Sequence, residues 1–473
     1  MSTQYPSTRR SVKTSILTLS LFCLIGLCSP PAIAGKTPEK APRSVNLTPR
    51  VVEGDVQHAQ VLFELDGALV LKSDTQGSVK APVQAKARLS YNEKVAQGST
   101  STTAWPRSTV RAYETAKATI KLRDRSITPS LRENRQLIVS SAQSAEDVML
   151  FSPLGPLRRD ELDLIDVPAN SAIINGLLPR QTVKIGETWK LQSDLLPAIL
   201  GVDAIASHDI QCRLARIENG SAVVEAEGTV SGASGGVATE IRWAAKYAYD
   251  VNRQRIAWFA MSLKENRSMG HAQPGLDATV RLQMALSERS DVPALHADSL
   301  SDLELTATPH VRLMEFVSPN GKFELLMSRK WHEMLDREDA CVLRLVDRGD
   351  LVAQCNLTAL PPMEDGVPFT LSDFQSDIKN VLDKQFGEFV SATEKVNENG
   401  LHVMRVVVNG MVSEVPINWV YYHLTNDQGR RASCVFTFES DLASRFGPAD
   451  QDLISSFRFR EPLNEQRDPT PGL

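Results

Sequence analysis

Strict alternation of apolar and polar residues is the feature that most constrains this chain, because it recurs over several segments. Between residues 83 and 91 the apolar positions are Val83, Ala85, Ala87, Leu89 and Tyr91. Residues 116–122 and 280–286 repeat the pattern. A period of two places every second side chain on the same face of a β-strand. These segments therefore predict antiparallel strands with one dry and one solvated face.

A segment of helical character interrupts the strands between residues 157 and 178. It mixes Leu162, Ile165 and Ile173 with acidic residues, and Pro168 is expected to divide it into two short helices. We therefore expect residues 51–290 to form a curved antiparallel sheet, a half-barrel, with inserted helices over its concave side.

The second half of the chain has a different pattern. Residues 291–309 lack a sustained period and predict a linker. Residues 310–460 then combine paired strands with a helix whose start Thr370 or Ser372 can cap and with a closing helix. This order predicts an α+β sandwich able to fold alone. The whole chain is thus expected to be mixed α+β. Residues 35–50 predict a flexible tether, and residues 461–473 a polar tail.

The first 34 residues predict export from a bacterial cell. A basic start precedes an apolar run too short to span a bilayer, and Ala32-Ile33-Ala34 offers small residues to signal peptidase. We expect cleavage between Ala34 and Gly35 and a periplasmic or extracellular location. A transmembrane anchor is the less favoured alternative.

Charge and hydropathy limit the partners. Cleavage would remove three basic residues and change the formal net charge from −5 to −8. No block of Lys and Arg stands out, so neither nucleic acid nor an anionic lipid surface is an expected partner. No second apolar run is long enough to span a membrane. The expected partner is an envelope or surface protein, or a lipid.

Cys341 and Cys355 flank a predicted hairpin turn at residues 347–350. A three-residue loop with Gly349 in the left-handed conformation would place the two cysteines directly opposite each other. A two-residue loop would instead place Val342 opposite Cys355. The glycine favours the first register, and export supplies oxidising conditions. We therefore predict a Cys341–Cys355 disulfide.

No motif predicts a catalytic, cofactor or metal site. Gly232-Ala233-Ser234-Gly235-Gly236 matches the nucleophile elbow of serine hydrolases, but a strand rather than a helix is expected to follow it, so a hairpin loop is favoured. The eight histidines are dispersed. The acidic residues Asp160, Glu161, Asp163 and Asp166 lack the glycine of a calcium loop and predict a solvated helix face.

The second domain resembles the PsbP-like family. Residues 320–325 (Asn-Gly-Lys-Phe-Glu-Leu), Trp331, and the ending at residues 453–459 carry the resemblance, which covers residues 316–459. Residues 327–330 depart from it, because a proline and a glycine usually precede the tryptophan. The resemblance implies an α/β/α antiparallel sandwich, in which helices flank an antiparallel sheet, and a non-catalytic extrinsic or envelope subunit.

The first domain resembles a family of exported bacterial proteins of unassigned function. Residues 178–189, from Leu178-Pro179 to Gly186 and Trp189, look like their signature. Such domains are similar to the half-barrels of LolA-type lipoprotein carriers. In this chain, Gly186 suits a turn and Trp189 a core anchor.

These features predict an exported, non-enzymatic envelope or surface protein that acts as a binding and docking module. The alternative is a lipid or lipoprotein carrier that uses the concave face of the first sheet. A serine hydrolase at Ser234 is a third, remote hypothesis.

Overall fold

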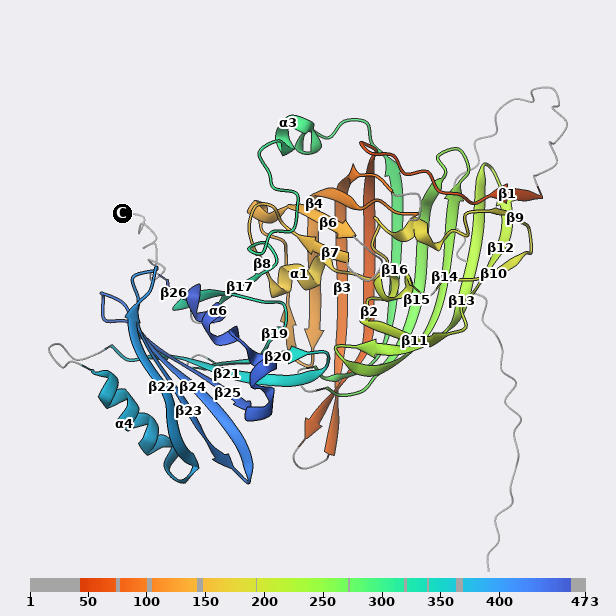
Figure 1. The fold of residues 1–473 in the computed structure, drawn as a ribbon. Coiled ribbons are helices and arrows are strands. Elements are labelled where there is room, and N and C mark those ends of the chain that lie inside the picture. The colour runs from red at the N-terminus through yellow and green to blue at the C-terminus, as the bar shows by residue number, and fades with distance from the viewer. Residues whose placement is uncertain are drawn as a thin grey trace, which may run out of the picture. The chain divides into compact units, whose positions relative to one another are not determined.

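The computed structural model describes residues 43–73, 77–99, 104–142, 148–192, 194–270, 273–318, 321–337, 340–362 and 369–460. Within these ranges, one antiparallel sheet of 13 strands is the largest element (Figure 1). Its strands, in pairing order, are β10 (Thr188–Lys190), β12 (Gln211–Glu218), β13 (Ser221–Ser234), β14 (Val237–Asp250), β15 (Arg255–Arg267), β16 (Gly275–Glu288), β2 (Val56–Ser73), β3 (Gly77–Gln97), β4 (Ser108–Leu122), β6 (Leu137–Ala142) and β7 (Val148–Phe151). Two shorter strands, β11 (Ala204–His208) and β5 (Arg125–Ile127), pair with β13 and β4.

Alternation divides this sheet into two faces, as predicted for residues 83–91, 116–122 and 280–286. The face that we call the covered face carries buried residues such as Val61, Leu89 and Trp243. The opposite face, which we call the outer face, carries Leu62 and Arg88, which are exposed. Since β2 pairs with β16, the first long strand joins the last one in the middle of the sheet.

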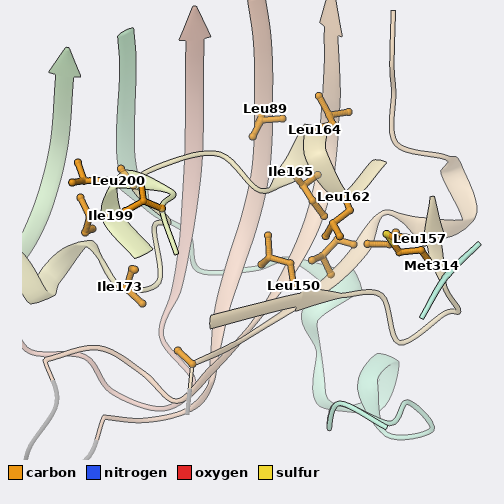
Figure 2. Packing of buried hydrophobic residues seen from close by; sticks show 14 of the residues in the cluster. Leu89, Leu150, Leu157, Leu162, Leu164, Ile165, Ile173, Ile199, Leu200 and Met314 are labelled. Atoms are coloured by element: carbon orange, nitrogen blue, oxygen red, sulfur yellow. The ribbon is translucent and has the colours of Figure 1, made fainter. Parts of the chain in front are cut away.

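Short helical turns between residues 159 and 200 pack on the covered face. They are α1 (Arg159–Ile165), η2 (Ile174–Leu177) and α2 (Leu196–Leu200). Figure 2 shows Leu162 and Ile165 of α1 and Ile199 of α2 in the buried cluster that also contains Leu89 of β3. Burial of this apolar surface attaches the inserted segment to the sheet.

A seven-stranded antiparallel sheet forms the second large element. Its strands, in pairing order, are β19 (Trp331–Arg337), β20 (Ala340–Asp347), β21 (Asp350–Leu360), β25 (Arg431–Glu439), β24 (Val415–Thr425), β23 (His402–Val412) and β22 (Phe386–Val396). Helix α4 (Leu371–Leu382) packs Phe374, Ile378 and Leu382 on it. As predicted, Thr370 caps this helix, in a reciprocal capping box with Asp373. The remaining short elements here are η4 (Asp383–Gln385), η5 (Ser440–Leu442), α5 (Ala443–Phe446) and α6 (Ala449–Ser455).

A small four-stranded sheet joins the two halves of the chain. It consists of β26 (Arg458–Phe459), β18 (Phe323–Met327), β17 (Met314–Val317) and β8 (Leu157–Arg158). Strand β8 comes from the inserted segment and pairs in parallel with β17, and Leu157 and Met314 are buried in one cluster (Figure 2). The two halves therefore share backbone hydrogen bonds and core.

Parts of the expected tether and linker are also structured. Strand β1 (Ser44–Asn46) pairs with β9 (Thr182–Lys184), and Leu47 is buried. Residues 291–309 contain η3 (Pro293–Leu295) and α3 (Ala297–Leu300), which bury Leu295 and Leu300 against Phe151. A further turn, η1 (Glu133–Arg135), precedes β6. The expected tether and the expected linker thus each contribute buried leucines, which the periodicity of the sequence does not reveal.

The predicted mixed α+β class is wrong, because 57% of the described residues lie in strands and 14% in helices, which makes the described part of the chain mostly β. The longest described helix, α4, has 12 residues, whereas β3 has 21. Helical segments of this length do not build the layers of an α/β/α sandwich. The large sheet is open: in the described ranges its strands run in order from β10 to β7, and the sheet does not close into a barrel. The strands are longer than the alternating segments seen in the sequence. Strand β3, for example, covers residues 77–97, whereas the alternating segment covers residues 83–91.

In the part of the chain that the structure describes, no helix is both long enough and apolar enough to cross a bilayer.

Candidate functional site

A cavity lies on the covered face where small side chains follow one another across strands β2 to β5. Its floor consists of Phe63 of β2, Ala85 and Ala87 of β3, Ala118 and Ile120 of β4, and Ile127 of β5. The register sets Ala87 directly opposite Ala118. Alanine methyl groups leave space that larger side chains would fill. The cavity volume is about 460 Å³, which lies in the range of small-molecule sites.

The opposite wall comes from α1, the residues that follow it, and the small sheet. Leu164, Phe316 and Met327 continue the apolar lining, whereas Asp160 and Asp163 make part of the rim acidic. The cavity is therefore amphipathic, with an apolar body and a polar opening.

A buried ion pair fixes α1 over the sheet. The Glu161 side chain is 1% exposed and accepts hydrogen bonds from the Arg132 guanidinium at 2.7 Å and from the Arg158 N–H at 2.9 Å. Arg132 also donates to Glu315 of β17 at 2.7 Å. Burial alone would raise the pKa of Glu161, but the Arg132 and backbone hydrogen bonds hold it below its usual value. The expectation of a solvated acidic face is thus wrong for Glu161, whose carboxylate points into the protein.

The charge around the cavity is predominantly negative. Its lining includes two arginines and five carboxylates, namely Arg158, Arg159, Asp160, Asp163, Asp166, Glu315 and Glu333. Arg159 lies 3.7 Å from Asp163 but also donates hydrogen bonds to the carbonyls of Arg329 and Trp331. Glu315 is paired with Arg132 and Arg158. The four remaining carboxylates still outnumber Arg159, the remaining arginine of the lining, which favours a cationic group at the opening.

Two of these carboxyls are less acidic than usual. The Asp163 side chain is 64% accessible because it opens onto the cavity. Surrounding protein still displaces much of its water and, together with the Asp166 and Asp160 carboxylates, raises its pKa to about 6 despite Arg159. Desolvation likewise raises the pKa of Asp166. A bound cation would favour the ionised form of both.

A second polar cluster is fully buried beside this site. Glu93 of β3 lies opposite Arg111 of β4, with Oε1 and Nε 2.8 Å apart, and the side chains are 1% and 2% exposed. Ser171 of the inserted segment donates to Glu93, and Tyr91 donates to Ser171 at 2.8 Å. Asn170 accepts from Arg111. The cluster therefore connects the inserted segment to the sheet. Its members use one another as hydrogen-bond partners, which indicates a structural role.

Neither the cavity nor the buried Glu93–Arg111 cluster was predicted from the sequence. Glu93 and Arg111 continue the dry rows of Tyr91 and Tyr113, so a charge at a core position was the available signal. The cavity had no signal beyond its alanines, because the segments that close it come from distant parts of the chain.

Ser234 lies in a strand hairpin, which is the context that the sequence analysis favoured over a nucleophile elbow. It pairs with Val237 of the following strand, β14. Its hydroxyl accepts a hydrogen bond from Arg267 at 2.9 Å. A cationic donor cannot take the proton of a nucleophilic serine, so this arrangement provides no activation for Ser234.

The register assumed for Cys341 and Cys355 is wrong. Asp347 pairs with Asp350, giving a two-residue loop, and a bulge follows, so Leu357 lies opposite Cys341 and Leu343 opposite Cys355. Neither cysteine forms a disulfide, and both are buried. Burial, with Cys434 and Cys341 nearby, raises the pKa of the Cys355 thiol well above its usual value, which disfavours the thiolate that disulfide exchange needs.

Two remaining expectations concern other parts of the chain. The cleavage site at Ala34 and Gly35 lies outside the described residues. In the ranges that the structure describes, no group of three or more His, Cys, Asp or Glu side chains is arranged to hold a metal ion.

Comparisons with known proteins give little further guidance. No family model matches the chain, and no curated protein matches it. A solved protein from Bacteroides thetaiotaomicron has 14% identity over 31% of this chain, with a TM-score of 0.24; the chain spans 48% of its length. Cyanobacterial PsbP from Synechocystis has 16% identity over 33% of this chain and 99% of its own, with a TM-score of 0.26. The chain thus has weak structural similarity to PsbP over part of its length, and neither comparison assigns a function.

Proposed function

We propose that this protein is an exported, non-enzymatic binding protein that holds an amphipathic ligand in the cavity beneath α1. The ligand has an apolar body and a cationic end. This proposal develops the carrier hypothesis, because the cavity occupies the covered face of the first sheet. The observation that carries it is the combination of an alanine-rich apolar floor with an acidic opening in one cavity of about 460 Å³.

The electrostatics support a cation in preference to a fatty acid. A carboxylate head group would meet Asp160, Asp163 and Asp166 at the opening. An ammonium group would instead reduce the mutual repulsion that contributes to the raised pKa of Asp163. Export rests on the leader at residues 1–34.

Binding can be tested by calorimetry with dodecylammonium and dodecanoate, which share an alkyl chain but differ in charge. We expect dodecylammonium to bind more tightly. Ala85→Phe fills the floor and should abolish binding, whereas the control Ala244→Phe places the same bulk on the outer face and should leave binding unchanged. Tighter binding of dodecanoate, or equal loss in both variants, would contradict the proposal.

The pH dependence gives a second readout. Asp163 is ionised above its pKa of about 6 and becomes neutral as the pH falls below it. The affinity for dodecylammonium should therefore decrease between pH 7 and about pH 5. Asp163→Asn should bind more weakly at pH 7 and show a smaller decrease on acidification.

Docking onto another envelope component is a second candidate, favoured by one surface. Three valines on α4 and the edge strand β22 are strongly exposed: Val381 by 76%, Val390 by 58% and Val396 by 67%. Capture of an envelope partner that is lost on replacing these three valines by serine, while dodecylammonium binding persists, would support this role.

A further inference from the structure

The outer face of the large sheet brings together three arginine and lysine side chains that are far apart in the sequence. Arg88 of β3 pairs directly with Lys117 of β4. Arg281 of β16 lies on the next row of the same face, two strands from Arg88, and is opposite Glu64 of β2. All three side chains are exposed. We call them the outer cationic cluster. This cluster is positively charged, whereas the formal net charge of the whole chain is −5.

This arrangement costs stability unless an anion is bound. Like charges that lie directly opposite each other on neighbouring strands repel. Among the described residues, none of the three cations makes an ion pair, whereas the neighbouring Lys86 pairs with Glu64 at 3.0 Å. Packing does not explain Arg88 opposite Lys117, since both side chains extend into solvent. The juxtaposition is accounted for by an anionic ligand that bridges them.

The surface around the cluster is hollowed and elongated. A depression of about 690 Å³ contains the three cations and the Lys86–Glu64 ion pair, which adds no net charge. Thr119, Thr128, Ser130 and Gln283 are its uncharged polar neighbours. A second depression of about 370 Å³ shares Leu62, Arg88 and Gln283 with the first and adds Trp258 of β15. Together they cross the strands from β15 to β4, about 19 Å at the usual strand spacing.

We propose that this outer groove binds an extended acidic polysaccharide. The cations match its repeated carboxylates, the hydroxyl and amide groups match sugar hydroxyls, and Trp258, which is 37% exposed, offers an apolar face for a sugar ring. This site lies on the face opposite the cavity, so the inference is independent of the proposed ligand there.

Two other anionic partners fit the groove less well. Single-stranded nucleic acid binds by stacking successive bases on several aromatic rings, and Trp258 is the one exposed large aromatic side chain in the described ranges. A lipid surface requires a broad apolar face, whereas the exposed apolar surface within the groove is limited to Leu62 and Trp258.

The test measures the affinity of the full chain for polygalacturonate, with neutral dextran as the uncharged control. We expect binding to polygalacturonate that weakens with added salt, and none to dextran. The triple variant Arg88→Ala, Lys117→Ala, Arg281→Ala should bind about tenfold more weakly. Because it relieves repulsion, its melting temperature should be equal to or above that of the native chain.

The matched control removes three exposed lysines from the second half of the chain by Lys379→Ala, Lys384→Ala and Lys395→Ala. This variant has the same change in net charge and should keep full affinity. Equal weakening in both triple variants would overturn the proposal, as would no binding to polygalacturonate. Tighter binding of a thymidine oligonucleotide or of phosphatidylglycerol vesicles would also overturn it, in favour of nucleic acid or membrane.

Discussion

Individual buried side chains hold the inserted segment in place over the large sheet. The Glu93–Arg111 pair is the clearest case, because two opposite charges are removed from water and share Ser171 as a common partner. Breaking such a pair by removing one member leaves an uncompensated buried charge. The site beneath α1 therefore depends on residues that do not line it.

Arg111→Met should lower the free energy of unfolding by about 3–5 kcal/mol, because it leaves Glu93 buried and unpaired. The double variant Glu93→Leu, Arg111→Met should recover part of this loss. Lys86→Ala, which breaks an exposed pair on the same sheet, should cost no more than about 1 kcal/mol. Urea unfolding measures all three, and equal costs for Arg111→Met and Lys86→Ala would contradict a structural role for the buried pair.

His423 predicts a dependence of stability on pH. It is 3% exposed beneath Phe369 and Phe374, and its Nε2 accepts a hydrogen bond from Arg431 at 3.0 Å. Burial, with the Arg431 charge, lowers its pKa to about 4. The unfolded chain therefore takes up a proton first, and the stability contributed by neutral His423 is lost as the pH falls from about 6.5 toward 4.

Between pH 7 and 5 this loss should be about 2 kcal/mol in the native chain and absent in His423→Gln. Unfolding in urea at both pH values measures it. His296→Gln, at a histidine that pairs with Asp291 on the surface, should behave like the native chain. A native-like loss in His423→Gln would contradict this account.

At the scale of elements, two hairpin turns meet where the large and seven-stranded sheets approach each other. Gly236, in the turn between β13 and β14, has a φ of +72°, and a Cβ there would overlap the backbone of Gly349 in the turn between β20 and β21. Asp203 accepts a hydrogen bond from the Gly236 N–H. Glycine is required at this position both for the backbone conformation and for the close approach.

Gly236→Ala should therefore destabilise the protein more than Gly77→Ala. Gly77 has a similar φ of +71°, but nothing lies within 4 Å of the added methyl group. The control should cost only the left-handed strain, about 1–2 kcal/mol, and Gly236→Ala should cost clearly more. Equal midpoints of urea unfolding would show that the two turns do not need to touch.

For the whole molecule, local pattern predicted individual elements but not their partners. Alternation identified the strands at residues 83–91 and 280–286, and Thr370 marked the start of α4. The pairing of β2 with β16 and the opposition of Arg88 and Lys117 depend on register between strands, which periodicity does not contain. The parallel pairing of β8 with β17 was likewise invisible, because each is too short to show a period.

Residues 310–460 are predicted to fold as an isolated fragment, because the seven-stranded sheet and α4 have their own cluster around Ile378 and Trp419. In the full chain, however, Met314 and Phe316 pack in the core shared with the first half. We therefore expect a β-sheet circular dichroism spectrum together with binding of an apolar dye that residues 43–460 do not bind. An unfolded spectrum would contradict the prediction of an independent fold.

The central claim is that the cavity beneath α1 holds the apolar body of a cationic ligand. The most direct measurement is photocrosslinking with a dodecylammonium analogue that carries a diazirine at the end of its alkyl chain, followed by peptide mapping. The account predicts labelling of the cavity floor and wall, at Phe63, Ile127 or Met327, and its loss in Ala85→Phe. Labelling at Trp258 on the outer face, or at the exposed valines of α4 and β22, would contradict it.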